Sequence, residues 1–378
     1  MAARLKPAFP WLAAVWIYWW TRLHNLDALP VFLDEAAHIW WARLAWEWQP
    51  FHAASDGRLL NVLWAAVFWP FNGSVWIARA STVLLTTLGF AALLAFARRF
   101  FQPTTAAVSA VIYTLVPFAL FFERMQLPDA YATACAVVLL WSSAELARSP
   151  TKRSNAVLTA LALTAGLLSK LTNLVFVPVP ALAALIIGRR DRWRTHTRAT
   201  VQTYLLASAL LLPVLAVLRT IALSDLGFDL LARKTAGTPT EMWAQTQLTA
   251  PMVWRFFHTL FTPWLWWPGL AVIAIALWQR ARVNLYVCTT ALLGLLPLIA
   301  KSNPGFLEAR FVLPYVALLT LLMAAGAATL WNRAVHLGAT VKIVAVALAL
   351  LALYPSGQFM LKAFSKPAAL ELPWRDEW

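Results

Sequence analysis

The chain has 378 residues, of which 61% are hydrophobic and only 12% are charged. Soluble domains carry about twice that charged fraction, so the composition excludes an ordinary soluble fold and predicts an integral membrane protein. Both cysteines, Cys135 and Cys288, lie in apolar stretches, which excludes a disulfide framework and a thiolate metal site. The net charge of +15 is explained by basic loops rather than by nucleic acid binding.

The first apolar stretch covers residues 7–22 and follows Arg4 and Lys6. It is rich in tryptophan, and no small-residue cleavage site follows it, so we predict a retained first helix rather than a cleaved signal peptide. The next segment, 23–75, is predicted to be the first long outer loop. Within it, an amphipathic helix over 36–48 is expected to lie in the membrane interface. A second apolar piece, 59–71, either lies there too or dips into the membrane.

Two adjacent acids stand in this first loop, Asp34 and Glu35, although only 16 residues of the chain are acidic. Carboxylates near the hydrocarbon boundary are costly unless they are solvated, paired or used in function. A structural alternative is that Asp34 caps the interfacial helix and Glu35 occupies its first turn. His38 follows Asp34 by one helical turn. Two ligands are too few to argue a metal site, so an exposed interfacial histidine is the simpler interpretation of His38.

Apolar segments continue to the end of the chain and predict about eleven transmembrane helices. The runs are long and continuous, which excludes a transmembrane barrel. The stretch 155–188 exceeds one span and predicts two short helices meeting near 169–173. We therefore predict an all-α polytopic membrane protein, a single domain over 1–378, with a second long outer loop at 220–258 and no separate soluble domain. The segments are 7–22, 76–97, 103–121, 129–147, 155–168, 173–188, 200–219, 259–279, 283–300, 311–331 and 340–361.

The distribution of basic residues predicts the orientation. Lysine and arginine are dense in the short loops of one face, including the cluster at 189–198, and this bias places the N-terminus in the cytoplasm and the C-terminus outside. Nearly every carboxylate then faces the outer side. Ionisable residues from distant parts of the chain share that face, and they are Asp34, Glu35, Arg124, Asp129, Lys170, Glu308 and Arg310.

These residue types suit glycosyl transfer, which needs a base to take the acceptor proton and cations to hold the departing phosphate. Each also has a structural interpretation. Asp129 fits a helix cap, and Lys170 either contacts phosphate or only extends from a helix end to the surface. Arg310 and Arg124 fit ordinary ion pairs with neighbouring glutamates.

Four motifs give the chain a family resemblance. They are the pair Asp34-Glu35, the Arg-x-x-x-x-Asp pattern of Arg124 and Asp129, the Gly-x-x-x-Lys turn ending at Lys170, and the entry to a late helix at 308–314. In this order the motifs resemble those of the C-type glycosyltransferases, in particular the bacterial branch related to protein O-mannosyltransferases and lipid A aminoarabinose transferases. The similarity spans roughly residues 10–330.

The resemblance implies a polyprenyl-phosphate-linked sugar donor and transfer with inversion, on the outer side of the bacterial cytoplasmic membrane. It implies Asp34 as the general base, with Glu35 as second choice. The implied substrate-binding residues are Arg124, Asp129, Lys170, Glu308, Arg310 and His38. No cofactor or metal is indicated, although a divalent metal is left open. The acceptor, a glycan, lipid or protein, is not identified.

Two departures from the family pattern stand out. No C-terminal soluble domain is expected after the last span, and Arg58-Leu59-Leu60 replaces a Pro-Pro pair common after the first loop in bacterial members. Two alternatives to an enzyme therefore stay open. One is a catalytically silent relative that serves as a subunit of a membrane complex. The other is a lipid or solute transporter, which would place ionisable residues near the midplane, often in repeated halves.

Overall fold

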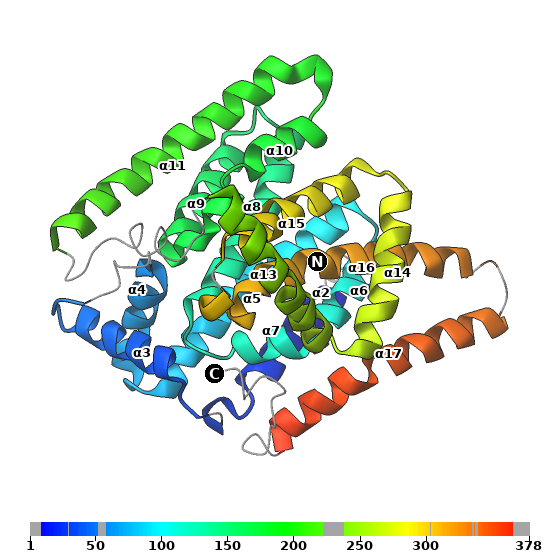
Figure 1. The fold of residues 1–378 in the computed structure, drawn as a ribbon, viewed down its shortest axis with the longest axis horizontal. Helices are drawn as coiled ribbons and strands as arrows, with labels where there is room; N and C mark the ends of the chain where they lie inside the picture. Colours follow the sequence, from blue (N-terminus) through cyan, green and yellow to red (C-terminus); the bar gives the residue numbers. More distant parts are fainter. Residues whose placement is uncertain are drawn as a thin grey trace.

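A computed structural model of the chain describes residues 9–28, 30–51, 58–221, 238–302, 304–334, 336 and 339–365. Within these ranges every regular element is an α-helix or a 3-10 helix, which confirms the all-α prediction (Figure 1). The α-helices are α2 (Phe9–Leu23), α3 (Leu33–Trp46), α4 (Leu59–Phe68), α5 (Val75–Phe100), α6 (Pro103–Leu115), α7 (Pro117–Phe122), α8 (Pro128–Arg148), α9 (Arg153–Ser169), α10 (Val179–Ile186), α11 (Trp193–Ile221), α13 (Pro239–Leu260), α14 (Pro263–Trp278), α15 (Arg282–Lys301), α16 (Leu313–Ala334) and α17 (Ala339–Ser365). Short 3-10 helices join them, among them η1 (Leu26–Ala28), η4 (Leu171–Phe176) and η7 (Ala309–Val312).

Six helical segments in the described ranges are long and apolar enough to cross a membrane, or seven if the bent pair α13 and α14 forms one span. About eleven spans were predicted. The difference arises because several predicted spans form helices that are short or broken. The segment predicted at 103–121, for example, divides into α6 and α7 at Pro117, whose ring cannot continue a helix. The chain is a multi-pass membrane protein.

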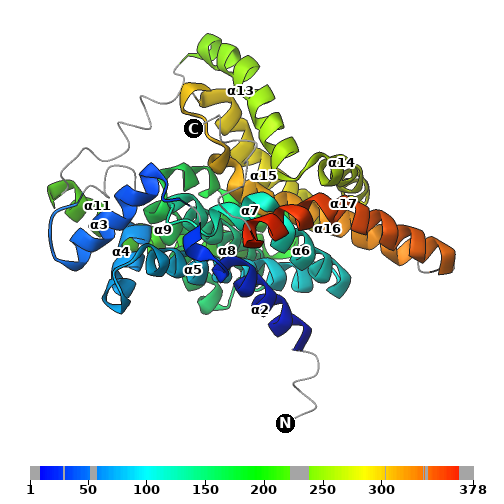
Figure 2. The same ribbon diagram turned by 90° about the horizontal axis from the view of Figure 1, so that it is seen from below.

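The second long outer loop was predicted over 220–258, and nearly all of its described part is helical. Residues 239–258 belong to α13, which starts with a capping box between Thr238 and Glu241. The part of that loop at 222–237 lies outside the described residues. After α13 the chain bends by 108° into α14, at Thr262 with a φ of 63°. Figure 2 shows α13 extending away from the rest of the bundle.

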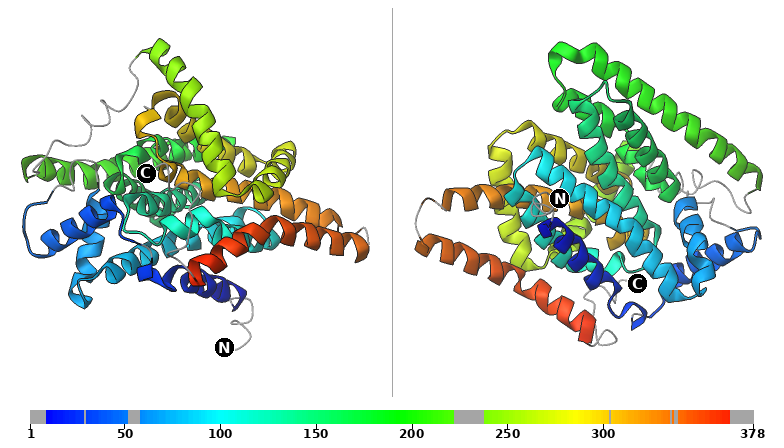
Figure 3. Two further views of the ribbon diagram at one scale, coloured as in Figure 1. Left: turned by 60° about the horizontal axis from the view of Figure 1, so that its bottom comes forward. Right: turned by 180° about the vertical axis from the view of Figure 1, so that it is seen from behind.

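Helices α5, α8 and α16 form the centre of the bundle, with 72%, 78% and 83% of their apolar windows buried. Helices α11 and α17 lie along opposite flanks, with only 17% and 6% buried (Figures 1 and 3). Their exposed faces are apolar, as expected for helices that contact lipid.

Glycines allow the closest approaches between these helices. A Cβ added at Gly326 on α16 would lie 1.8 Å from the backbone carbonyl oxygen of Val272 on α14. Small residues at such contacts let membrane helices pack backbone to backbone. We therefore expect Gly326→Ala to separate α14 from α16 and to lower the melting temperature of the purified protein by several degrees, on the order of 1–3 kcal/mol of overpacking. Thermal unfolding in detergent measures this.

A matched control lies on α17. A Cβ added at Gly357 would meet no atom within 4 Å in the described structure. Because alanine favours helix more than glycine does, Gly357→Ala should leave the melting temperature unchanged or raise it slightly. Equal melting temperatures for the two variants would show that α14 and α16 are not packed as described.

Candidate functional site

Helix α3 presents the two adjacent acids. It begins at Leu33, three residues before the predicted start, and its N-cap is Phe32. Asp34 and Glu35 are therefore both inside its first turn, where acids suit the positive end of the helix dipole. The prediction that Asp34 caps the helix is wrong. The capping prediction for Asp129 is wrong for the same reason, because Leu127 occupies the N-cap position of α8 and Asp129 lies inside the first turn.

Arg310 is the centre of a cluster of carboxylates. It lies in η7, just before α16, and its side chain is 7% exposed. Its Nη2 atom is 2.5 Å from Oδ2 of Asp34, and its Nε atom is 3.8 Å from Oδ2 of Asp129. Nε also forms an ion pair with Glu308. The predicted Arg310–Glu308 pair is present, but Arg310 joins two further acids from other helices and is no ordinary surface charge.

Lys170 completes the cluster from the end of α9. Its Nζ atom lies 2.6 Å from Oδ1 of Asp129 and 3.9 Å from the ring centre of Phe311. The side chain is 13% exposed, so the interpretation of Lys170 as a lysine that only reaches the surface is wrong. Burial lowers the pKa of Lys170, and the charge of Asp129 opposes that shift.

His38 is fully buried, which corrects the expectation of an exposed interfacial histidine. Its Nε2 atom lies 3.1 Å from Nη1 of Arg58, the residue that precedes α4. Burial, and then the charge of Arg58, lower the pKa of His38 to about 3, so the ring is neutral at physiological pH. In the described residues no group of three or more His, Cys, Asp or Glu side chains is placed to hold a metal ion.

The cluster that includes Arg310 contains equal numbers of acidic and basic side chains. The acids are Asp34, Asp129 and Glu308, and the bases are Arg58, Lys170 and Arg310. Asp34 is the acid open to solvent on the α3 side, with 37% of its side chain exposed. Its burial raises the pKa of Asp34, but the hydrogen bond and charge of Arg310, together with Arg58 and His38, outweigh burial and leave the pKa below its usual value.

Glu35 points away from this cluster although it neighbours Asp34. Its side chain is 0% exposed, and Arg79 of α5 binds both carboxylate oxygens at 2.8 and 2.6 Å. The backbone N–H of Gln126 donates to Oε1 at 2.9 Å. A carboxylate so enclosed is not placed to take a proton from a substrate, which corrects the second-choice prediction of Glu35 as the base. We assign it a structural role.

Arg124 is also directed elsewhere. Its Nη2 atom donates to the carbonyl oxygens of His24 and Asn25, both at 2.7 Å, and so ties the first loop to the turn before α8. Burial lowers the pKa of Arg124 to about 10. The expected pair with Glu123 is absent from the described contacts. Glu123 binds Arg22 instead, and the substrate-binding prediction for Arg124 gives way to a structural role.

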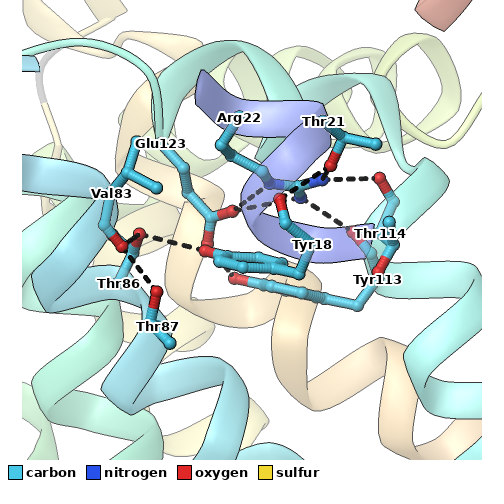
Figure 4. Close-up of polar contacts among 9 residues, drawn as sticks. All are labelled: Tyr18, Thr21, Arg22, Val83, Thr86, Thr87, Tyr113, Thr114 and Glu123. Atoms are coloured by element: carbon cyan, nitrogen blue, oxygen red, sulfur yellow. Dashed lines mark hydrogen bonds and ion pairs between the residues drawn. The ribbon is translucent and has the colours of Figure 1, made fainter. Parts of the chain in front are cut away.

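The Arg22–Glu123 pair forms a second buried polar network (Figure 4). Arg22, at the end of α2, donates to Glu123 at 3.1 Å and to the carbonyl oxygens of Tyr113 and Thr114 at 3.2 and 2.7 Å. The hydroxyl of Tyr113 donates to Glu123 at 2.7 Å. These carbonyls are left without helical partners because α6 ends at Leu115, before Pro117. The network therefore joins α2 to the break between α6 and α7.

An apolar cavity of about 480 Å³ adjoins the Arg310 cluster. Phe311 in the cavity wall contacts the cluster, because its ring centre lies 3.9 Å from Nζ of Lys170 and 5.9 Å from the guanidinium carbon of Arg310. Lys301 and Ser302 provide polar groups in its wall. The cavity is bounded by η4, the end of α15 and the start of α16, and its lining includes Leu174, Val175, Phe176, Gly294, Pro297, Leu298, Pro314 and Tyr315.

Arg79 was not among the predicted site residues, and Arg58 was noted only as part of a departure from the family pattern. The sequence did contain an indication that Arg79 is important. It is a lone arginine within the apolar segment 76–97, and ionisable residues inside such segments are paired or functional. For Arg58 the residue type alone gave no signal, since its link to His38 depends on how α3 packs on α4.

Comparison with known proteins agrees with this architecture. Residues 60–217 match the family model of dolichyl-phosphate-mannose-protein mannosyltransferases. No curated protein matches the sequence significantly. Among solved structures, ArnT from Cupriavidus metallidurans in the apo state superimposes with a TM-score of 0.61 and 15% identity, over 96% of this chain and 75% of ArnT. ArnT bound to undecaprenyl phosphate gives the same TM-score and identity, over 87% of this chain and 61% of that chain.

The Archaeoglobus fulgidus oligosaccharyltransferase in complex with Zn and sulfate is also similar, with a TM-score of 0.55 and 12% identity, over 92% of this chain. This chain spans 52% of that protein. At these identities the structural matches show the fold. The resemblance stated from the four motifs is confirmed at that level, and the chain is a multi-pass membrane protein with the C-type glycosyltransferase fold.

Proposed function

We propose that the chain transfers a sugar from a polyprenyl-phosphate carrier to an acceptor hydroxyl on the outer face of a bacterial cytoplasmic membrane, with Asp34 as general base. The observation that carries this proposal is the convergence at Arg310. Acids from α3, α8 and the approach to α16 meet two basic side chains beside an apolar cavity. Such a site offers a base, cations for a phosphate and room for an apolar chain.

The roles follow from charge and exposure. Asp34 has an exposed carboxylate and takes the acceptor proton as the new bond from the acceptor oxygen to the sugar C1 forms. The bond from C1 to the phosphate oxygen breaks, and the electron pair leaves with the polyprenyl phosphate. Arg310 and Lys170 are the cations placed to stabilise that phosphate. Attack on the face opposite the leaving group inverts the sugar configuration.

Arg310 also links donor binding to the strength of the base. Without donor, its hydrogen bond holds the pKa of Asp34 below the usual value, which makes Asp34 a weak base. A bound phosphate competes with Asp34 for the same guanidinium. The pKa of Asp34 then rises, and a base whose pKa is nearer the working pH is more effective.

The cavity beside Phe311 is proposed to hold the first part of the polyprenyl chain. Its position next to both cations lets the lipid phosphate reach them while the chain stays in apolar surroundings. The similar ArnT structure was obtained with undecaprenyl phosphate bound, which supports a carrier of this class.

Narrowing the cavity tests the proposal. Leu298→Trp places a larger side chain in the cavity wall and is expected to raise the KM for a polyprenyl-phosphate sugar by about tenfold, with a smaller effect on kcat. Transfer of labelled sugar by the purified protein in liposomes measures both. Leu296→Trp is the control, because Leu296 lies on the same helix but is 59% exposed and outside the cavity.

Two outcomes would count against the proposal. Equal KM values for the two tryptophan variants would remove the cavity as the donor site. Wild-type protein that binds polyprenyl phosphate yet transfers no sugar, across a panel of donors and acceptors, would favour the catalytically silent subunit.

A further inference from the structure

Arg79 organises the first loop from inside the bundle. It lies near the start of α5, its side chain is 0% exposed, and it makes contacts with three parts of the loop. Nη1 donates to the carbonyl oxygen of Leu26 at 2.7 Å, and Nη2 donates to that of Pro30 at 3.2 Å. Nε and Nη2 bind the two oxygens of Glu35. One buried guanidinium thus holds residues 26, 30 and 35 together.

These contacts control where α3 starts and how it is rotated. Glu35 is the third residue of α3, so fixing its side chain fixes the first turn. A second group strengthens the hold, because the N–H of Gln126 also donates to Glu35, and the Gln126 side chain donates to the carbonyl oxygen of Asn61 on α4. Asp34 precedes Glu35 in the same turn, and successive helical residues point about 100° apart. With Glu35 held inward, Asp34 is held toward Arg310.

We propose that Arg79 is a positioning residue for sugar transfer: by holding Glu35 and the preceding loop, it keeps the carboxylate of Asp34 in contact with Arg310 and open to the acceptor. This inference rests on the function proposed above. Arg79 touches no reacting atom, so its effect passes through the placement of α3.

The geometry requires arginine rather than any cation. A guanidinium presents five N–H donors in a rigid fork, which can serve a carboxylate and two carbonyl oxygens at once. Lysine keeps the charge but supplies three donors from a single atom and cannot span these acceptors. Arg79→Lys should therefore retain the buried charge balance with Glu35 while loosening the first turn of α3.

Loosening α3 has a consequence that can be measured in the pH profile. Asp34 is faced by Arg310 from η7, Arg58 from the start of α4 and His38 from α3, while Asp129, Glu308 and Lys170 surround Arg310. Among these, the hydrogen bond from Arg310 is the largest influence that lowers the pKa of Asp34. If Asp34 withdraws from Arg310 in the free enzyme, the pKa of Asp34 rises, and the acid limb of the kcat/KM profile moves to higher pH.

The experiment compares Arg79→Lys with wild-type enzyme in liposomes, using a polyprenyl-phosphate sugar as donor. We expect kcat to fall by about tenfold to a hundredfold, because small misplacements of a catalytic group are costly. The KM for the donor should change by no more than about twofold, since the cations and the cavity are untouched. The acid limb of kcat/KM, which reports the enzyme without bound donor, should move to higher pH.

The chain offers a matched control in Arg22→Lys. Arg22 is equally buried, pairs with Glu123 and binds two backbone carbonyls, but it holds the break between α6 and α7 rather than α3 (Figure 4). Both lysine variants should lower the melting temperature. The folded fraction of the Arg22→Lys protein should keep the acid limb and the kcat of wild type.

Two results would overturn the inference. One is an Arg79→Lys variant whose acid limb and kcat match those of wild type. The other is an Arg22→Lys variant that moves the acid limb by the same amount, which would mean that Arg79 only stabilises the fold. If Arg79→Lys does not fold, Glu35→Gln is tested instead. The glutamine side chain has the shape of glutamate, but only one of its two terminal atoms can accept a hydrogen bond from Arg79. The same shift of the acid limb to higher pH is expected. Wild-type protein without any transfer would refute the proposed function instead.

Discussion

Asp34→Asn is expected to reduce sugar transfer by about 10³-fold, within the range that a general base contributes, and to leave the fold intact. The amide cannot take the acceptor proton. Its oxygen can still accept the hydrogen bond that Arg310 now donates to Asp34, so the geometry around Arg310 is preserved. Arg310 keeps Asp129 and Glu308 as partners, so the substitution leaves no buried charge unpaired.

Single-turnover transfer at saturating donor, in liposomes, isolates this effect on the chemical step. Donor binding, measured by competition with polyprenyl phosphate, should be unchanged or slightly tighter, because Arg310 becomes more available to the phosphate. Asp191→Asn is the control, since that acid is exposed on another part of the surface and pairs with Arg189. Transfer by Asp34→Asn at a rate within threefold of wild type would exclude Asp34 as the base.

Arg310→Met is expected to raise the donor KM by about 100-fold and to lower kcat as well, because a cation that stabilises the leaving phosphate is removed. The change also leaves Asp34, Asp129 and Glu308 without the guanidinium that joins them. Removing the partner of a buried or half-buried acid leaves an uncompensated charge and strongly destabilises the fold, so the melting temperature should fall too. Arg310→Lys should recover part of the binding, because it restores the charge without the fork.

Donor titrations at fixed ionic strength, together with thermal unfolding, separate the two effects of Arg310→Met. Arg189→Met is the matched control, because that arginine pairs with Asp191 while 69% exposed, and exposed pairs contribute little. A donor KM for Arg310→Met within about twofold of wild type would mean that the phosphate is bound elsewhere.

Much of the fold could be predicted from the sequence, because long apolar runs in a membrane protein have few alternatives to helix. The predicted span at 76–97 became α5, and the one at 311–331 became α16. The count of spans was harder to predict. Hydropathy does not show that Pro117 breaks a helix or that α13 turns by 108° into α14, since both segments remain apolar across the break.

The site was predictable only in part. That Asp34, Asp129, Lys170, Glu308 and Arg310 would share one face followed from topology and from the family resemblance, and the structure brings them together. The resemblance implied Asp34 ahead of Glu35, but topology and residue type alone could not show which of the two adjacent acids faces the cluster. That choice depends on where α3 begins, and the start lies three residues earlier than its amphipathic pattern indicates.

Residues that hold the loops were the most difficult to identify. Arg124 and Arg310 are both buried arginines near predicted helix ends, and residue type does not distinguish one that binds backbone carbonyls from one that collects carboxylates. The difference is made by long-range packing, as with Arg124 and the carbonyl of His24, which are 100 residues apart.

The adjacent acids of α3 have consequences for how this chain can change over time. Truncating Glu35 would leave the buried guanidinium of Arg79 without its carboxylate and loosen the first loop, so the fold constrains that position to a side chain of similar shape that accepts hydrogen bonds. The fold does not constrain Asp34 in this way, because its side chain is partly exposed to solvent and an amide can replace it. A homologue could therefore lose catalytic activity through a single substitution at Asp34 and still keep the same fold.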